Sequence, residues 1–358
     1  MAADGSLASW LRLTLAPGVG GETQRRLLQA FGLPEAIFAA GMKALAGVVG
    51  AAPAERLLAF DAAAEIEAAV TWAASPGNRI LTLADADYPQ ALLECADPPT
   101  LIYLKGEASL LNERCLAIVG SRNPTPQGEA NAVAFAGELA AAGLTIVSGL
   151  ALGIDAAAHR GALKAGGHTI AVIGTGADRI YPARNRELAH AIGERGAILS
   201  EFPLGTPPLP GNFPRRNRLI AGLSRGCLVV EAAAKSGSLI TARLAAESGR
   251  EVFAIPGSIH SPLSKGCHQL IRQGAKLVDA AGDVLEELGW ASARPAEPAA
   301  AVPAADALLS ALGRDPCTLD VLAARAGLTP DALLAMLLQL ELEGHVASLP
   351  GGRYQRLN

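Results

Sequence analysis

Short runs of apolar, β-branched residues recur through the middle of the chain, and stretches with helical character separate most of them. The runs that follow residue 114 are CLAIVG, LTIVSG, HTIAVIG, GAILSE, CLVVEA and EVFAIPG. The intervening stretches are about ten to twenty residues long, as in QGEANAVAFAGELAAAG. Continuous apolar strands that alternate with amphipathic helices predict a parallel sheet with both faces covered.

The segment before this region has a helical pattern. Residues 6 to about 70 predict helices, and LTLAPGVGGETQRRLLQAFG at 13–32 resembles a helix-hairpin-helix. In that motif a glycine turn and a helix N-terminus can offer N–H groups to a phosphate. The alternative is a small helical packing domain, which we favour because Arg25 and Arg26 are the only cations near the turn. Residues 72–112 are interpreted as a joining segment.

The C-terminal segment begins with ASARPAEPAAAVPAA, whose Pro/Ala content is typical of a linker. A helix, an AGL turn, a second helix and two short strands around PGG then resemble a winged helix. We therefore divide the chain into a helical domain resembling SAM or helix-hairpin-helix modules, the sheet domain, the linker and the winged helix, at 1–72, 73–289, 290–305 and 306–358.

The second helix of the winged domain carries the wrong charge for a reader of duplex DNA. TPDALLAMLLQLELEG contains Asp331, Glu341 and Glu343 and no lysine or arginine. A duplex carries a dense line of negative charge, which would repel this helix. Arg353 and Arg356, at the wing, are the cations left to touch phosphate. We expect a partner-binding or structural domain here.

Composition narrows the class of protein. The 358 residues are 50% hydrophobic and carry a net charge of −4, so a binding site for a polyanion has to be local. Five cysteines without a CxxC pair suit a reducing cytosol. The N-terminus shows no signal peptide, and no apolar run is long enough to span a membrane. We expect a cytoplasmic protein without membrane association.

Several kinds of site are disfavoured by missing motifs. The chain has no GK dipeptide for a P-loop, and Arg179 stands where GTGADR would need the third glycine of a dinucleotide site. No HExxH or Cys/His cluster has zinc spacing. Asp155 and His159 could form an acid/base pair, but no nucleophile accompanies them, so we favour a helix cap and a packed imidazole. We predict no catalytic residue, no metal and no cofactor.

Small, hydroxyl and cationic residues follow the predicted strands. Because the carboxyl ends of parallel strands meet at one edge, we expect these loops to form a receptor for phosphate. Tyr181 and Arg186 lie in the same loops. The candidate binding residues in these loops are Gly120, Ser121, Arg122, Gly149, Arg184, Asn185, Lys235, Ser236, Gly237, Ser238 and Thr241.

A further loop, FPRRNRLIAGLSR at 213–225, combines a ring with four arginines and no acid. Phe213 offers a surface on which a base can stack, and the apolar LIAGL anchors the helix. A ring with surrounding cations favours single-stranded nucleic acid over a bare phosphate or a duplex. The candidate residues are Phe213, Arg215, Arg216, Asn217 and Arg218. One or two of the arginines are expected to pair with Glu201 or Glu231 instead, and a double Arg215/Arg216→Ala change is expected to leave folding intact.

In their order, these motifs resemble the DNA-processing protein A (DprA/Smf) family. The resemblance is carried by GSR, SGLALGIDAAAH, GTGADRIYP, FPRRNRLIAGLS, VVEAAAKSGSLITA and PGS followed by GCHQLIRQGA. It covers roughly residues 80–288, and the helical and winged domains match the larger members. His268 departs from the pattern, which has asparagine there.

The resemblance implies a Rossmann-like, doubly wound, mostly parallel sheet and a non-enzymatic role. Members bind incoming single-stranded DNA in natural transformation, protect it and load the recombinase RecA onto it. They act as dimers built through the Rossmann-like domain. Carried over, the family's DNA pocket points to Ser121, Arg122, Phe213, Arg215, Arg216 and Asn217.

Two other classes stay open. Rossmann-like relatives include nucleotide-binding enzymes that hydrolyse the glycosidic bond of nucleoside monophosphates, and nucleotide sensors. Their PGGxGTxxE motif is missing, and the PGG at 350–352 lies in the predicted wing. Turnover of a nucleoside monophosphate would favour the enzyme. A purely structural adaptor would bind no nucleic acid.

Overall fold

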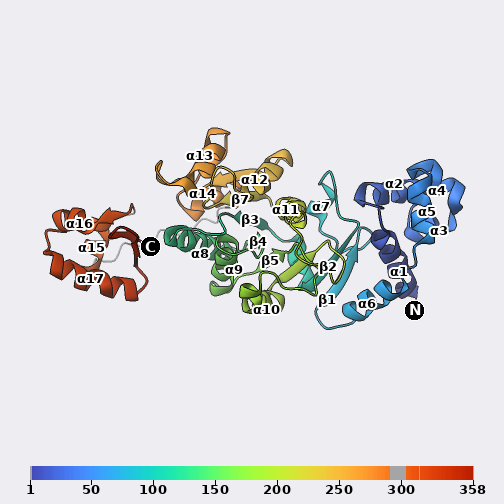
Figure 1. The fold of residues 1–358 in the computed structure, drawn as a ribbon, viewed down its shortest axis with the longest axis horizontal. Coiled ribbons are helices and arrows are strands. Elements are labelled where there is room, and N and C mark those ends of the chain that lie inside the picture. The colour runs from blue at the N-terminus through green and yellow to red at the C-terminus, as the bar shows by residue number, and fades with distance from the viewer. Residues whose placement is uncertain (1, 291–303, 314, 358) are drawn as a thin grey trace.

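The computed structural model describes residues 2–290, 304–313 and 315–357. A helical body, a central sheet body and a C-terminal body follow one another along the longest axis (Figure 1). The predicted linker at 290–305 lies, for its residues 291–303, outside the described part of the chain.

The N-terminal body is built from helices, as predicted for residues 6–70. Leu13, Leu27, Ile37, Leu45 and Leu57 are fully buried and form its core. The turn at 16–20 joins the first two helices. The helices are α1 (Ala2–Leu15), α2 (Gly21–Phe31), α3 (Pro34–Ala39), α4 (Gly41–Val49), α5 (Ala51–Ala59) and α6 (Ala63–Ala73).

A nine-stranded sheet lies at the centre of the described chain, in the order β1-β2-β6-β5-β4-β3-β7-β8-β9. The strands from β3 to β9 are parallel to one another, and the six predicted apolar runs all form strands. The parallel strands are β3 (Cys115–Val119), β4 (Thr145–Ser148), β5 (Thr169–Val172), β6 (Ala197–Ser200), β7 (Gly226–Val229), β8 (Glu251–Ala254) and β9 (Lys276–Leu277).

The interpretation of residues 72–112 as a joining segment is wrong, because this segment completes one side of the sheet. Strand β1 (Asn78–Thr82) pairs antiparallel with β2 (Leu101–Gly106), and β2 pairs antiparallel with β6. The short helices α7 (Gln90–Leu93) and η1 (Ala108–Asn112) lie in the same segment.

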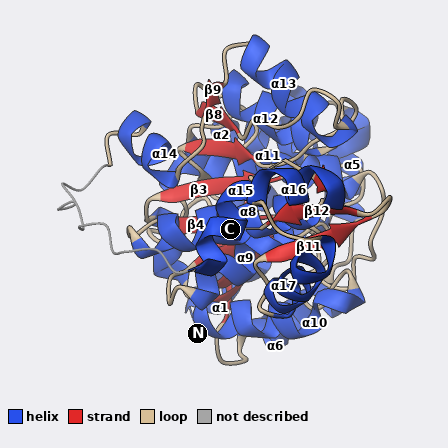
Figure 2. Cartoon of the chain, turned by 90° about the vertical axis from the view of Figure 1, so that its left-hand side faces the viewer, coloured by secondary structure: helices blue, strands red, loops and turns tan. Residues whose placement is uncertain are grey.

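Helices cover both faces of the sheet, so side chains along each strand alternate between two cores. In β3, Ala117 packs in the core shared with α11, α12 and α13, whereas Ile118 packs in the core shared with α8, α9 and α14. Figures 1 and 2 show the two helical layers with the strands between them. The helices are α8 (Pro126–Ala141), α9 (Ile154–Lys164), η2 (Ala183–Asn185), α10 (Arg186–Arg195), α11 (Asn212–Leu223), α12 (Ser238–Glu247), η3 (Pro262–Ser264), α13 (Lys265–Arg272) and α14 (Ala281–Glu287).

The order of the strands reverses between β3 and β7. The chain runs from β3 through β4 and β5 to β6 on one side, then returns to place β7 and β8 on the other side of β3. Such a doubly wound sheet has a crevice at the carboxyl ends of its strands where the order reverses. The predicted binding loops follow those carboxyl ends, so the fold brings them to one edge.

The C-terminal body has the helices and wing strands of the predicted winged helix. Leu312, Leu322 and Leu337 are buried in its core. On the outer face of α17, Leu338 and Leu342 are 60% and 82% exposed. The elements are α15 (Ala304–Leu312), β10 (Cys317–Thr318), α16 (Leu319–Ala326), α17 (Pro330–Leu342), β11 (Val346–Leu349) and β12 (Arg353–Arg356), with β12 between the other two strands.

Neither a helix suited to cross a membrane nor a metal-binding cluster occurs among the described residues. No described helix combines the length and apolar character needed to cross a bilayer. The described His, Cys, Asp and Glu residues form no group of three that could hold a metal ion. Cys115 and Cys227 are buried in β3 and β7, and burial raises the pKa of each thiol to about 12.

Candidate nucleic-acid interface

The loops that follow β3 and β7 are bonded directly to each other. Ser121 N donates to Glu231 O at 2.7 Å, and Thr125, the N-cap of α8, donates from N and Oγ1 to the Glu231 carboxylate at 2.9 and 2.6 Å. A Cβ on Gly120 would lie 2.7 Å from Ile154 Cγ1, so only glycine fits there. Of the two carboxylates expected as alternatives for pairing with an arginine, Glu201 or Glu231, Glu231 accepts hydrogen bonds from Thr125 instead.

Cationic side chains from several loops point outward at this edge. Arg122, Arg184, Arg215 and Lys235 are exposed. Within the described residues, no ion pair involves Arg122, Arg184 or Lys235, so their charges are uncompensated by contact. Gly237 is also exposed, and the candidate residues that are half-buried are Gly120, Phe213, Asn217, Arg218 and Ser236.

Arg216 lies beneath this surface, and the expectation that it stands beside Phe213 at the surface is wrong. It is 3% exposed, and its Nη1 donates to Gly149 O at 2.6 Å and to Val172 O. Its Nε donates to Asn217 Oδ1 at 3.2 Å. Burial lowers the pKa of Arg216 to about 10, against the opposing attraction of Asp155. Arg216 therefore ties the carboxyl ends of β4 and β5 to α11.

Asp155 and His159 belong to the same buried layer. Asp155 Oδ2 accepts from Gly149 N at 3.1 Å, and burial raises the pKa of this carboxyl while Arg216 opposes the rise. The carboxylate thus holds the loop between β4 and α9 by a hydrogen bond to its backbone. His159 is fully buried, and its Nδ1 lies 2.6 Å from Thr169 Oγ1, which itself donates to Ile146 O. Nδ1 therefore carries the hydrogen, as a packed imidazole would.

Other candidate residues hold loops rather than facing outward. Asn185 is 5% exposed and donates from Nδ2 to Leu150 O at 2.8 Å and to Ala151 O at 3.2 Å. It thereby fastens the loop after β5 to the loop after β4. Ser236 Oγ, in the loop before α12, lies 2.7 Å from Oγ of Ser238, the first residue of that helix. The candidate residues that the structure buries are Ser121, Gly149, Asn185, Arg216, Ser238 and Thr241.

Two aromatic rings, Phe213 and Tyr181, lie against each other at this edge, with Arg122 beside Phe213. Phe213, in the first turn of α11, packs on Gly174, where an added Cβ would lie 3.0 Å from Phe213 Cδ1. The guanidinium carbon of Arg122 is 5.7 Å from the Phe213 ring centroid. The Tyr181 ring is 5.8 Å away between centroids, with 39° between the planes. The sequence places Tyr181 in one of the candidate loops, but no sequence pattern indicates that its ring lies beside Phe213.

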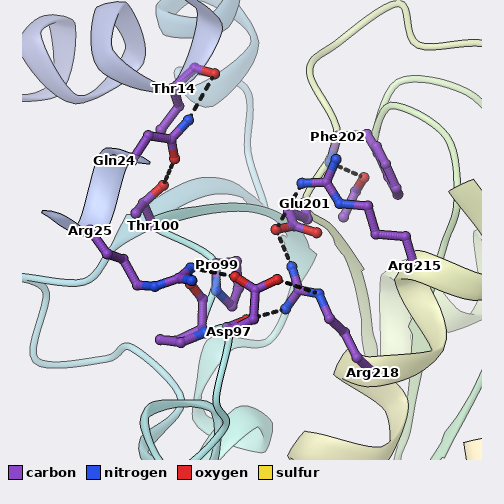
Figure 3. A network of polar contacts seen from close by, with 12 residues as sticks. Thr14, Gln24, Arg25, Asp97, Pro99, Thr100, Glu201, Phe202, Arg215 and Arg218 are labelled. Carbon is purple, nitrogen blue, oxygen red and sulfur yellow. Dashed lines mark hydrogen bonds and ion pairs between the residues drawn. The ribbon is translucent and has the colours of Figure 1, made fainter. Parts of the chain in front are cut away.

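Acidic residues hold the remaining arginines of α11 (Figure 3). Arg218 pairs with Glu201 Oε1 and, from Nε at 3.4 Å, with Asp97 Oδ2. Arg215 Nη2 lies 3.4 Å from Glu201 Oε1, and its guanidinium carbon is 5.5 Å from the Phe202 ring centroid. The Arg215 side chain is 54% exposed and that of Arg218 16%, so Arg215 is free to turn toward a ligand and Arg218 is not. Pairing of one or two arginines with Glu201 is confirmed.

The same network reaches the helical body. Arg25 pairs with Asp97 Oδ1 and donates to Pro98 O at 3.1 Å. Beside it, Thr100 Oγ1 donates to Gln24 Oε1, and Gln24 Nε2 donates to Thr14 O at 3.4 Å (Figure 3). Gln24 Nε2 also donates to Val19 O at 2.8 Å. Arg25 is therefore engaged by a carboxylate rather than presented to a phosphate, which favours the packing-domain interpretation of this body.

Family models match most of the described chain. Residues 79–289 match the model described as DNA recombination-mediator protein A, and residues 291–352 match the DprA winged helix domain. The first match covers the sheet body, and the second covers much of the C-terminal body.

Individual proteins agree with these matches. Protein Smf of Escherichia coli K12 is 44% identical over 85% of this chain and 84% of its own length. The crystal structure of DNA processing protein A from Streptococcus pneumoniae superposes with a TM-score of 0.69 and 41% identity, covering 78% of this chain and 97% of that one. A Helicobacter pylori DNA processing protein A structure, whose title concerns its single-stranded DNA binding mode, has a TM-score of 0.54 and 34% identity, covering 58% of this chain and 95% of that one.

Proposed function

Because the chain belongs to the DNA recombination-mediator protein A family, we propose that it binds single-stranded DNA at the carboxyl edge of its sheet. The observation that carries the proposal is the set of exposed cations on the loops at this edge, together with the Phe213 and Tyr181 rings beside Arg122. Guanidinium and ammonium groups bind the phosphates of a nucleic-acid backbone. Aromatic rings stack with unpaired bases independently of base sequence. The Helicobacter pylori relative, described as binding single-stranded DNA, supports this assignment.

The biological role follows from the same membership. We propose that the protein protects incoming DNA during natural transformation or recombination and transfers it to the recombinase RecA. It would act in the cytoplasm, without a cofactor, as a homodimer built through the Rossmann-like domain, and it would leave the strand chemically unchanged. Asp155 and His159 support a non-enzymatic role, because both are buried and hydrogen-bonded, Asp155 to the loop after β4 and His159 to Thr169 of β5.

The winged helix would not read duplex DNA. The exposed face of α17 carries Leu334, Leu338 and Leu342, and no lysine or arginine occurs in that helix. Apolar exposed faces on helices fit partner proteins rather than phosphate backbones. A partner-binding or structural role therefore suits this domain better than groove recognition.

A binding comparison tests the proposal. The full chain is titrated with a single-stranded oligonucleotide and with its duplex at several salt concentrations. We expect tighter binding of the single strand and a linear fall of log affinity with log salt concentration, because released counterions drive the phosphate contacts. RecA is then added to the preformed complex, and filament growth on the strand is followed. Equal affinity for both forms would refute the single-strand site, whereas tight binding without faster filament growth would refute only the transfer to RecA.

A further inference from the structure

We propose that Tyr181 provides the exposed ring on which a nucleobase of the bound strand stacks, and that Phe213 supports it from behind. This inference rests on the proposed single-strand function and deepens it. It moves the stacking contact away from Phe213, the residue that the sequence favoured, to a residue in the loop after β5.

Phe213 has little ring surface left for a base. It is half-buried in the first turn of α11 and rests on the Gly174 backbone, where even a methyl group would crowd its Cδ1 at 3.0 Å. The Arg122 guanidinium carbon lies 5.7 Å from its centroid, and the Tyr181 ring lies 5.8 Å from it. These three neighbours fix the ring in place and make it a support for what lies outside it.

Tyr181 has the surface that Phe213 lacks. It is 47% exposed, one of the most exposed aromatic rings in the described chain. A base cannot enter between the two rings, because two stacking contacts of about 3.5 Å would need roughly 7 Å between parallel planes. The centroids are 5.8 Å apart, and the planes are tilted by 39°. A base therefore has to stack on the face of Tyr181 that points away from Phe213, so that Tyr181 lies between the base and Phe213.

The loop that carries Tyr181 is held on both sides. Before it, Thr175 Oγ1 donates to Arg179 O at 2.9 Å, and Arg179 N donates to Gly176 O at 2.9 Å. After it, buried Asn185 donates to the loop that follows β4. A ring that is already fixed loses little entropy when a base stacks on it, which favours binding.

Cations near the ring pair suit the backbone of a stacked nucleotide. Arg184 is exposed three residues after Tyr181 in the same loop, and the Arg122 guanidinium carbon is 5.7 Å from the Phe213 centroid. A base on Tyr181 would thus have a cation available for a neighbouring phosphate. Because stacking strength grows with ring area, we expect purines to bind this surface better than pyrimidines.

The test compares base-bearing and abasic strands of equal length. Wild type, Tyr181→Ala, Tyr181→Phe and Arg122→Ala are titrated with oligo(dA) and with an oligonucleotide of abasic deoxyribose phosphates, at low salt. Met42→Ala, at a 40% exposed apolar position in α4, is the control, and unfolding curves verify that every variant folds. For oligo(dA) we expect Tyr181→Ala to raise Kd roughly 5- to 100-fold, while Tyr181→Phe stays within about twofold of wild type.

On the abasic strand, Tyr181→Ala should match wild type, and Arg122→Ala should weaken binding to both probes. The inference is overturned if Tyr181→Ala leaves the affinity for oligo(dA) unchanged, or weakens both probes equally. It is also overturned if Tyr181→Phe loses as much as Tyr181→Ala, since the hydroxyl would then be the contact. In these cases the proposed single-strand binding function is still supported if Arg122→Ala weakens binding of both probes. Failure of wild type to bind oligo(dA) would refute the function itself.

Discussion

Arg215 and Arg216 are neighbours in α11, yet they belong to two layers of the same sheet edge. The Arg215 side chain is 54% exposed and makes one loose ion pair, whereas Arg216 is 3% exposed and bonds to main-chain carbonyls of the β4 and β5 ends. The outer layer, with Arg122, Arg184 and Arg215, has charge to offer a ligand. The inner layer, with Arg216 and Asp155, uses its polar groups to fix the loops that carry the outer one, whereas His159 is buried against Thr169 of β5.

The difference shows that a cluster of arginines in sequence is not one functional unit. In a helix, residues three and four apart share a face. Arg216 precedes the buried Leu219 and Ile220 by three and four residues, so it faces the core. Arg215 has buried Leu219 four residues on but half-buried Arg218 three residues on, so it lies at the edge of that face.

The largest effect expected from this comparison is on folding. Arg216→Ala removes a buried charge and leaves Gly149 O and Val172 O without a donor, so we expect the free energy of unfolding to fall by about 3–5 kcal/mol. Arg215→Ala is the matched control and should change it by less than about 1 kcal/mol. Denaturant unfolding of both variants measures this. Similar changes in unfolding free energy for Arg215→Ala and Arg216→Ala would contradict the distinction between the two layers. The sequence alone predicts that the double Arg215/Arg216→Ala variant folds normally; because Arg216 is buried, we instead expect that variant to be destabilised.

A smaller effect should appear as the pH falls. Burial, with Arg216 and Arg160 adding to it, lowers the pKa of His159 to about 3. Below pH 6.5 the unfolded chain therefore binds a proton that the folded chain excludes, and stability is lost as pH falls from 6.5 toward 3. The loss from this residue is up to about 1.4 kcal/mol per pH unit.

The window between pH 6.5 and 5 isolates this contribution, because most carboxylates stay ionised there. His159→Gln should show a shallower dependence of unfolding free energy on pH in this window than wild type. His168→Gln, which changes an exposed histidine, is the control and should keep the wild-type slope. Equal slopes for wild type and His159→Gln would mean that His159 is accessible to protons in the folded state.

Much of the fold could be predicted, because local patterns determine it. The six central strands and the start of α8 at Pro126, after its Thr125 cap, follow from apolar runs and capping chemistry. Strands β1 and β2 were missed because they are antiparallel additions at the edge, without the alternation of strand and helix that identified the others.

The location of the candidate site could be predicted from the sequence, but which of its polar residues are exposed and which are buried could not. Strand ends placed the candidate loops at one edge, as observed. The contacts of Asp97 with Arg25 and Arg218 join residues 72 and 121 positions apart, and no local pattern signals such pairs. The burial of Asn185 likewise depends on carbonyls from a different loop, at 150 and 151.

The salt dependence of single-strand binding tests the central claim most directly. The log–log slope of affinity against salt concentration is measured for wild type and for a double Arg122→Ala, Arg215→Ala variant. Arg79→Ala, which removes an exposed arginine of β1, is the control. If the outer arginines hold phosphates, each loss should reduce the slope by about 0.7, or about 1.4 for the double variant, while the control keeps the wild-type slope. A double variant with the wild-type slope would contradict the claim that the strand binds at this edge.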